Sequence, residues 1–231
     1  MPGTPIAAGS DETSQLQIRF VVPPAFHDLP VFGTEDQVAA ELWELACEVL
    51  AADPAEVRLG WAALLAELIP PMGAAGVIYA GVCLAEVDGR PSSAAITASV
   101  CPLVGTDLPG AVDFLLARLA RARPGAEVTA IDLPAGRAVA VIDALPANAP
   151  LDDGREPTVS LIQVHLPLPN ETELLTLELS TPCPEEWELY SELFAGVVRN
   201  LYLEFADLPY ATGPVEPPDE ELAARVRAAF G

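Results

Sequence analysis

Three short turn signals, each lying between two strand-like runs, constrain the fold of this chain more than any other feature of its sequence. The signals are Asp88-Gly89, Ala135-Gly136 and Asn170-Glu171. Asp-Gly favours a tight hairpin because both residues tolerate the positive φ that the turn requires. A hairpin pairs consecutive strands antiparallel, so the three signals together predict a mainly antiparallel sheet.

The third hairpin also predicts which residues face one another. With a two-residue turn at 170–171, His165 pairs with Thr176, and Gln163 pairs with Glu178. Alternation places His165 and Gln163 on the same face of their strand. A histidine beside a threonine on a half-polar strand face is more often structural than catalytic.

Apolar residues at helical spacing predict the helices. The first follows a capping box formed by Thr34 and Gln37. The second is expected to end at Pro70 and to bury one apolar stripe, made of Val57, Trp61, Leu64, Leu65 and Leu68. A third is expected to begin at Asp107, and the last keeps its apolar spacing from Trp187 to Phe205.

These elements, with a first strand at residues 15–23, predict an α+β fold. We expect a mainly antiparallel sheet of about seven strands with helices packed on it, an α/β/α sandwich, plus a C-terminal tail helix. The expected organisation is a flexible leader (1–14), a single domain (15–205), a Pro-rich linker (206–218) and a short amphipathic tail helix (219–231).

The later part of the chain resembles a known superfamily. A strand pair, LPLPNETELLTLELSTP, ends in a Thr-Pro turn and is followed by the helical run EEWELYSELFAGVVRNLYLEF. This layout resembles the PsbP-like superfamily of α/β/α sandwiches over roughly residues 15–205, and actinobacterial proteins with the same ending. The resemblance implies binding of partner proteins as an accessory or assembly factor, and it implies no shared catalytic site.

The charge balance excludes several function classes. The chain has 34 acidic and 11 basic residues, a formal net charge of -23. Such a surface repels phosphate backbones and anionic membranes, so neither nucleic acid nor membrane is expected as a partner. A basic protein partner fits the charge. All the basic residues are arginine, which excludes a Schiff-base lysine and the usual phosphate-binding P-loop.

The start of the chain bears on its location. It shows no signal-peptide pattern, and the expected location is cytoplasmic. The four cysteines are then expected to be reduced.

Candidate catalytic groups are few. His27 and Asp28 are adjacent and could form a fragment of a general base, but sequence neighbours rarely point together. Cys183 lies at the expected start of the last helix, where a thiol is more reactive, and His165 is on the preceding strand pair. The histidines and cysteines are too scattered to hold a metal. We therefore predict no catalytic, cofactor-binding or metal-binding residues.

The end of the chain carries the clearest functional signal. Leu222, Val226 and Phe230 fall on one narrow apolar face of the expected tail helix, with Arg225 beside them. We predict these as partner-binding residues. A helix this short is marginal alone and needs a surface to pack against. It could fold back on its own domain, dock into a partner's groove, or pack on a second copy to make a homodimer.

The sequence therefore favours a non-enzymatic protein-interaction protein, such as an adaptor, chaperone or accessory subunit, with the acidic surface and the tail as contact elements. A narrower version is an immunity-type inhibitor of a basic toxin. The alternative is a small-molecule-binding protein or enzyme with a pocket between sheet and helices.

Overall fold

The computed structural model describes residues 6–7, 16–105, 108–146 and 158–205, and within them it confirms a mixed α+β fold. The helices are α1 (Glu35–Val49), α2 (Ala55–Ala74), α3 (Leu108–Ala122) and α4 (Trp187–Arg199), with a 3₁₀ turn η1 (Pro184–Glu186) before α4. The strands are β1 (Ile6–Ala7), β2 (Leu16–Arg19), β3 (His27–Asp28), β4 (Val77–Val87), β5 (Arg90–Pro102), β6 (Glu127–Leu133), β7 (Gly136–Pro146), β8 (Thr158–Pro167), β9 (Glu173–Thr181) and β10 (Tyr202–Phe205).

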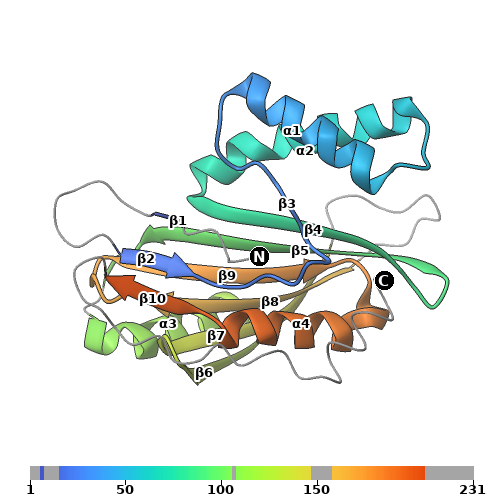
Figure 1. Cartoon of the computed structure of the whole chain (residues 1–231). Helices are drawn as coiled ribbons and strands as arrows, with labels where there is room; N and C mark the ends of the chain where they lie inside the picture. The colour runs from blue at the N-terminus through green and yellow to red at the C-terminus, as the bar shows by residue number, and fades with distance from the viewer. Residues whose placement is uncertain (1–5, 8–15, 106–107, 147–157, 206–231) are drawn as a thin grey trace.

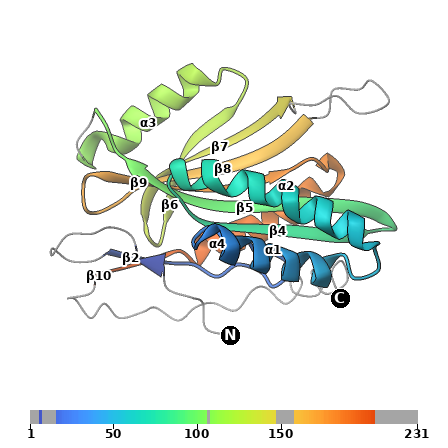
Figure 2. The ribbon, with the colours of Figure 1, turned by 90° about the horizontal axis from the view of Figure 1, so that it is seen from above.

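The main sheet has seven antiparallel strands in the order β3-β4-β5-β9-β8-β7-β6, as expected. A small three-stranded sheet, β1-β2-β10, lies apart from it. Helix α4 and the small sheet lie on one face of the main sheet (Figure 1). Helices α1 and α2 cover the β4 side of the opposite face, and α3 covers the β6–β8 side of that face (Figure 2). The fold is thus an α/β/α sandwich.

The three hairpins form where predicted, but two of their turns differ from the prediction. The β8–β9 connection is longer than the expected two-residue turn, because β8 ends at Pro167 and β9 begins at Glu173. Asp88 and Gly89 have φ values of 52° and 75°, the positive values that a two-residue hairpin turn requires. In the β8–β9 hairpin His165 pairs with Thr176 and Gln163 with Glu178, so the predicted register is confirmed. In the β6–β7 hairpin Gly136 already pairs with Leu133, so the turn residues are 134 and 135 instead of 135 and 136.

Helix α2 is longer than predicted. It continues through Pro70 and Pro71 to Ala74, although a proline inside a helix removes a hydrogen bond. Both prolines are exposed, so water can bond the carbonyls that they leave without a donor. The helix ends before Gly76, which has a φ of +74° and where an added Cβ would lie 2.3 Å from the Val100 carbonyl oxygen. Only glycine fits there, and it turns the chain into β4.

The first strand and the last helix differ from the prediction. The first strand is confined to Leu16–Arg19, and it pairs with β10 rather than with the main sheet. The last helix stops at Arg199 instead of continuing to Phe205, and residues 202–205 form β10. Aromatic residues favour strands, and pairing with β2 outweighs the helical spacing of the sequence. An ion pair of 3.1 Å between Arg19 and Glu204 joins the two strands.

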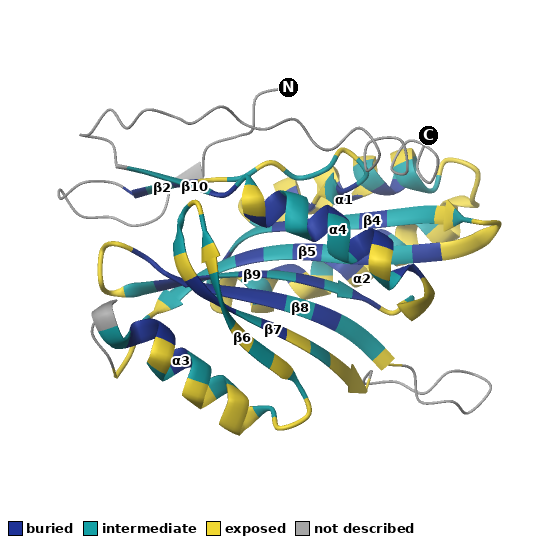
Figure 3. Cartoon of the chain, turned by 90° about the horizontal axis from the view of Figure 1, so that it is seen from below, coloured by how far each residue is buried: buried dark blue, intermediate teal, exposed yellow. Residues whose placement is uncertain are grey.

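The two faces of the main sheet have different chemistry. Toward α4 the central strands present apolar residues such as Ile96, Val164 and Leu177, which pack with the buried side of α4. Figure 3 shows that β8, in the middle of the sheet, is buried along most of its length. On the opposite face, apolar residues lie under α1 and α2 at one side and under α3 at the other. The strands between those two helical covers present mostly polar side chains on this face.

Candidate functional site

The first candidate site is the solvent side of α2. Its large apolar residues are exposed, and Leu59 and Leu64 keep 63% and 58% of their accessible surface. We define the α2 face as the exposed Val57, Leu64 and Leu68, which share one side of the helix, together with Trp43 of α1. Leu59 is exposed on a different side of α2. The sequence pattern had placed Val57, Leu64 and Leu68 in a buried stripe, and that prediction was wrong. The residues that α2 buries are Ala62, Leu65 and Ile69.

The exposed side of α2 also carries little charge. The only charged residues of this 20-residue helix are Glu56, Arg58 and Glu67. A surface helix normally turns charged and polar residues to the solvent, and an apolar solvent face marks an interaction surface. The signal was present in the sequence, because α2 is apolar on every side, and a single buried stripe cannot account for all of it.

The neighbouring helix gives the α2 face an acidic border. Helix α1 has no basic residue, and its exposed acidic side chains are Glu35, Asp36, Glu41, Glu44 and Glu48. The Arg58 guanidinium lies 5.9 Å from the ring centroid of Trp43, where a cation interacts favourably with the aromatic face. The surface therefore combines an apolar centre with a negatively charged edge.

The second candidate site lies on the main sheet between α2 and α3. There β5, β9 and β8 present a block of polar side chains, in which Thr97, Glu178 and Gln163 form one cross-strand row. Ser99, Thr176 and His165 form the next row. We call these residues, with Ser180, the polar strip. Figure 2 shows β8 between the two helical covers.

His165 is the most unusual member of the polar strip. The side chain is only 8% exposed, its Nδ1 lies 3.0 Å from Thr176 Oγ1, and its Nε2 has no hydrogen-bond partner among the described residues. Burial and the nearby Arg123 guanidinium lower the pKa of His165 from 6.5 to about 4. The imidazole is therefore neutral at physiological pH, and it can act as a hydrogen-bond donor or acceptor without charge.

The other histidine does not form a catalytic pair. Asp28 accepts a hydrogen bond of 2.7 Å from the Tyr79 hydroxyl, which raises the pKa of Tyr79 together with the larger effect of burial. His27 Nδ1 instead lies 4.0 Å from Glu48 of α1. The two neighbours on β3 thus interact with different elements, in agreement with the structural interpretation of this dipeptide.

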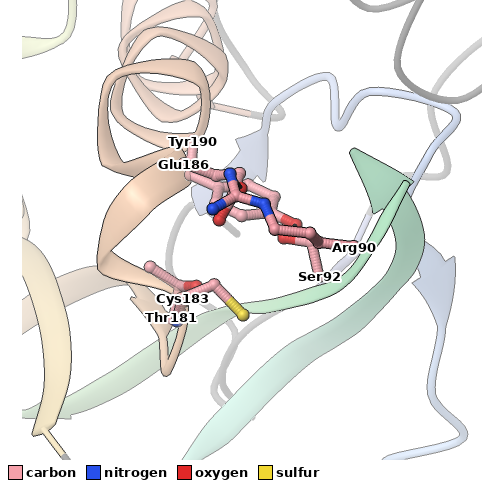
Figure 4. A network of polar contacts seen from close by, with 6 residues as sticks. All are labelled: Arg90, Ser92, Thr181, Cys183, Glu186 and Tyr190. Atoms are coloured by element: carbon pink, nitrogen blue, oxygen red, sulfur yellow. Dashed lines mark hydrogen bonds and ion pairs between the residues drawn. The ribbon is translucent and has the colours of Figure 1, made fainter. Parts of the chain in front are cut away.

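Cys183 belongs to a structural network at the start of α4 (Figure 4). Its backbone N–H donates to Thr181 Oγ1 at 3.0 Å, and it precedes η1 as the cap residue. In the same network Arg90 pairs with buried Glu186 at 2.7 Å, and the hydroxyls of Ser92 and Tyr190 lie 2.7 Å apart.

The network and the polar strip lie on different faces of the main sheet. Tyr190 and the neighbouring Cys83 belong to the core on the α4 side, whereas His165 alternates to the other face. Cys183 and His165 therefore do not form a catalytic pair. Burial raises the pKa of the Cys83 thiol to about 12, so this thiol stays protonated.

The predicted partner-binding residues of the tail are not among the residues that the structure describes. Leu222, Val226, Phe230 and Arg225 lie outside the described residues, as does Asp107. Within the described residues, histidine, cysteine and acidic side chains form no group of three or more suited to a metal. Among the same residues, no helix has both the length and the apolar character that a membrane crossing needs.

No family model, curated protein or solved structure matches the chain. The resemblance to the PsbP-like superfamily therefore stays a prediction.

Proposed function

We propose that this chain is a non-enzymatic interaction protein that binds a partner protein through the α2 face. The observation that carries the proposal is the row of Val57, Leu64 and Leu68 along one side of α2, which the fold of the described residues leaves exposed. A group of exposed apolar side chains marks an interaction surface, and tryptophan, here Trp43, is enriched among the residues that dominate binding energy in protein interfaces.

The charge around the α2 face selects the kind of partner. The border contributed by α1 is acidic, and the whole chain has a net charge of -23. The matching partner presents an apolar segment with arginine or lysine at its edges, because opposite fields speed encounter and favour the correct orientation. A second copy of the chain fits poorly, since two acidic borders would repel each other.

The proposal includes the roles expected from the sequence. An adaptor, a chaperone and an accessory subunit all bind partners in this way, and an immunity-type inhibitor of a basic toxin is a narrower form of the same function. We also keep the expectation of a cytoplasmic protein that binds neither nucleic acid nor membranes, because its acidic charge opposes both.

Site-specific photo-crosslinking in native lysate tests the proposal. The full chain carries a crosslinking amino acid at position 64 or, as the matched control, at Ala117, an exposed residue of α3. We expect a specific adduct from position 64 alone, with the crosslinked partner peptide rich in apolar and basic residues. The adduct should disappear in the Leu68→Glu background.

Other adducts would overturn the proposal. Crosslinking of position 64 to residues 219–231 of the same chain would make the α2 face an internal docking surface for the tail. A chain truncated after Thr212 identifies that case, because it loses the adduct. An adduct between two copies would indicate a homodimer. Equal adducts from positions 64 and 117 would mean that the α2 face has no specific partner.

Binding measurements with the purified partner then give the contribution of Leu64 to the affinity. Leu64→Glu places a buried charge in the interface, and we expect Kd to rise at least about 10-fold, equivalent to roughly 1.4 kcal/mol. Binding should also weaken with added salt, because the partner's basic edge faces an acidic border.

A further inference from the structure

The two outer edges of the main sheet differ in how they are protected. At one edge β3 pairs with β4, and the Leu29 N–H, just beyond β3, donates to the Ala80 carbonyl oxygen at 2.8 Å. At the other edge β6 pairs with β7 and, among the described residues, with no strand on its outer side. This β6 edge lies at the end of the molecule opposite to α1 and α2 (Figure 1). Its outer backbone groups are a template for a further strand.

Strand β6 lacks the features by which proteins usually block an edge strand. Those features are proline, a bulge, lysine or a very short length. β6 has seven residues and no proline, and its pairing with β7 continues without a bulge from Glu127 to Leu133. Its charged residues, Glu127 and Asp132, lie towards its two ends, and the residues from Val128 to Ile131 are uncharged. The centre of β6 is therefore open to pairing.

The β6–β7 turn determines which backbone groups point outward. It has two residues, so Leu133 and Gly136 are the closing pair and bond each other. Bonded and non-bonded pairs alternate along an antiparallel ladder, so the N–H and C=O groups of Val128, Ala130 and Asp132 point away from β7. Helix α3 packs on the side chains of Val128 and Ala130, which covers one face of β6 and not its outer backbone groups.

The charge around β6 selects the strand that fits this edge. Residues 108–146, which form α3, β6 and β7, have no net charge, because four arginines balance four acidic residues: Arg118, Arg121, Arg123 and Arg137 against Asp113, Glu127, Asp132 and Asp143. The rest of the chain carries the whole net charge of -23. A basic partner therefore gains little attraction at β6, whereas a second copy of the chain is repelled least there.

We propose that a second copy of the chain adds its β6 to this edge, so that the two main sheets join across a two-fold axis into one continuous antiparallel sheet. In the register centred on Ala130, this residue pairs with its own copy, and Val128 pairs with Asp132. On the other sheet face Thr129 lies opposite Ile131. This register places no two acidic side chains directly opposite each other.

The dimer also has a consequence for the α2 face. The sheet order places β4, which α2 covers, near the edge far from β6, so both α2 faces stay free at the two ends of the joined sheet. This consequence rests on the proposed function, under which the dimer binds two partners, or two sites of one partner, at once.

Sedimentation velocity of the full chain at rising protein concentration tests the dimer. The edge variant is Thr129→Lys, and the matched control is Ala40→Lys, which makes the same charge change at an exposed position of α1. We expect the wild type and Ala40→Lys to dimerise with a Kd on the order of 10 μM, because one strand pair buries less than a standard interface. In Thr129→Lys the Kd should rise at least about 10-fold, since lysine on an edge strand opposes pairing.

Two further measurements separate the β6 edge from other surfaces. Leu68→Glu in the α2 face and a chain truncated after Thr212 should dimerise like the wild type. In the wild type, hydrogen exchange followed by NMR should slow at high protein concentration for the outward amides of Val128, Ala130 and Asp132. This readout needs no variant, and circular dichroism checks that each variant is folded.

Several outcomes would overturn the dimer. A wild type that stays monomeric up to about 1 mM would leave the β6 edge to a strand of another protein. Equal dimerisation of Thr129→Lys and Ala40→Lys, or outward amides whose exchange is independent of concentration, would place the contact elsewhere. Loss of the dimer in Leu68→Glu would assign it to the α2 face, and loss on truncation would assign it to the tail.

Discussion

Helices α4 and α2 both have long apolar sequences, but they place those residues differently. In α4 the side chains of Leu189, Tyr190, Leu193, Phe194, Val197 and Val198 are all buried against the main sheet. In α2 only one narrow side is buried, and Leu59 and Leu64 face the solvent. The sheet therefore uses the whole apolar side of α4, whereas α2 has more apolar surface than the described fold buries. That excess is the basis of the proposed function.

The largest expected effect concerns stability. Because α4 is buried along its apolar side and α2 is not, substitutions of apolar residues in the two helices should change the free energy of unfolding by different amounts. Phe194→Ala in α4 removes a side chain that is only 2% exposed, and we expect a loss of about 3–5 kcal/mol in the free energy of unfolding. Leu64→Ala in α2 should change it by less than about 0.5 kcal/mol. Urea denaturation of both variants measures the contrast. A comparable loss in the two would show that the α2 face is already packed in the free protein.

The second prediction extends the comparison to the two faces of the main sheet. His165 has a pKa of about 4 when folded and 6.5 as its ordinary value, so the unfolded chain binds a proton more readily. The free energy of unfolding should therefore fall as the pH drops from 6.5 towards 4. The whole loss, reached below the pKa of the folded protein, should be roughly 3 kcal/mol. His165→Gln removes this effect, and the other titrating groups act equally on both proteins.

Urea denaturation of wild type and His165→Gln at several pH values gives the difference between the two proteins. Parallel curves over this range would contradict the burial of a neutral histidine in the polar strip.

A smaller effect is expected from the network under α4. Tyr190→Phe removes a hydrogen bond to the buried Ser92, and the lost stability should be about 1–2 kcal/mol. Removing both hydroxyls, with Ser92→Ala added, should cost little more, because the buried Ser92 hydroxyl is then no longer left without its partner. Thermal unfolding of the single and double variants measures this. Additive losses would show that the two hydroxyls act independently.

The smallest effect on stability is expected where the α2 face is changed. Leu68→Glu should alter the free energy of unfolding by no more than about 0.5 kcal/mol, because the residue is exposed. The same change should reduce fluorescence of a hydrophobic dye such as ANS, while Ala117→Glu on α3 leaves it unchanged. Equal dye fluorescence in both variants would mean that the α2 face is not the main exposed apolar surface.

Local patterns were enough to predict the register of the β8–β9 hairpin, although its loop is longer than the expected two-residue turn. The centre of the turn and strict alternation determine every pair along the ladder, so His165 could be placed opposite Thr176 from the sequence. The capping box of Thr34 and Gln37 is likewise complete, with both reciprocal hydrogen bonds formed. These predictions succeeded because the interactions involved are close in sequence.

The errors arose where distant segments decide the outcome. The helical spacing beyond Arg199 is real, but β2, far away in sequence, pairs with residues 202–205 and makes them a strand. The sequence could not show which side of α2 would be buried, because leucines occur on several sides of it and the packing of α1 and β4 selects Leu65 and Ile69. Nor could it show that His165 lies close to Arg123, which follows α3.

Residue type and short-range spacing were sufficient for the antiparallel hairpins, the helix starts, the acidic charge and the exclusion of lysine chemistry. They were not sufficient for the two sites. That an apolar side of α2 faces the solvent, and that polar rows from β5, β9 and β8 share one sheet face, became evident only in the folded chain. Exposure and proximity are set by long-range packing, which joins segments that no local pattern relates.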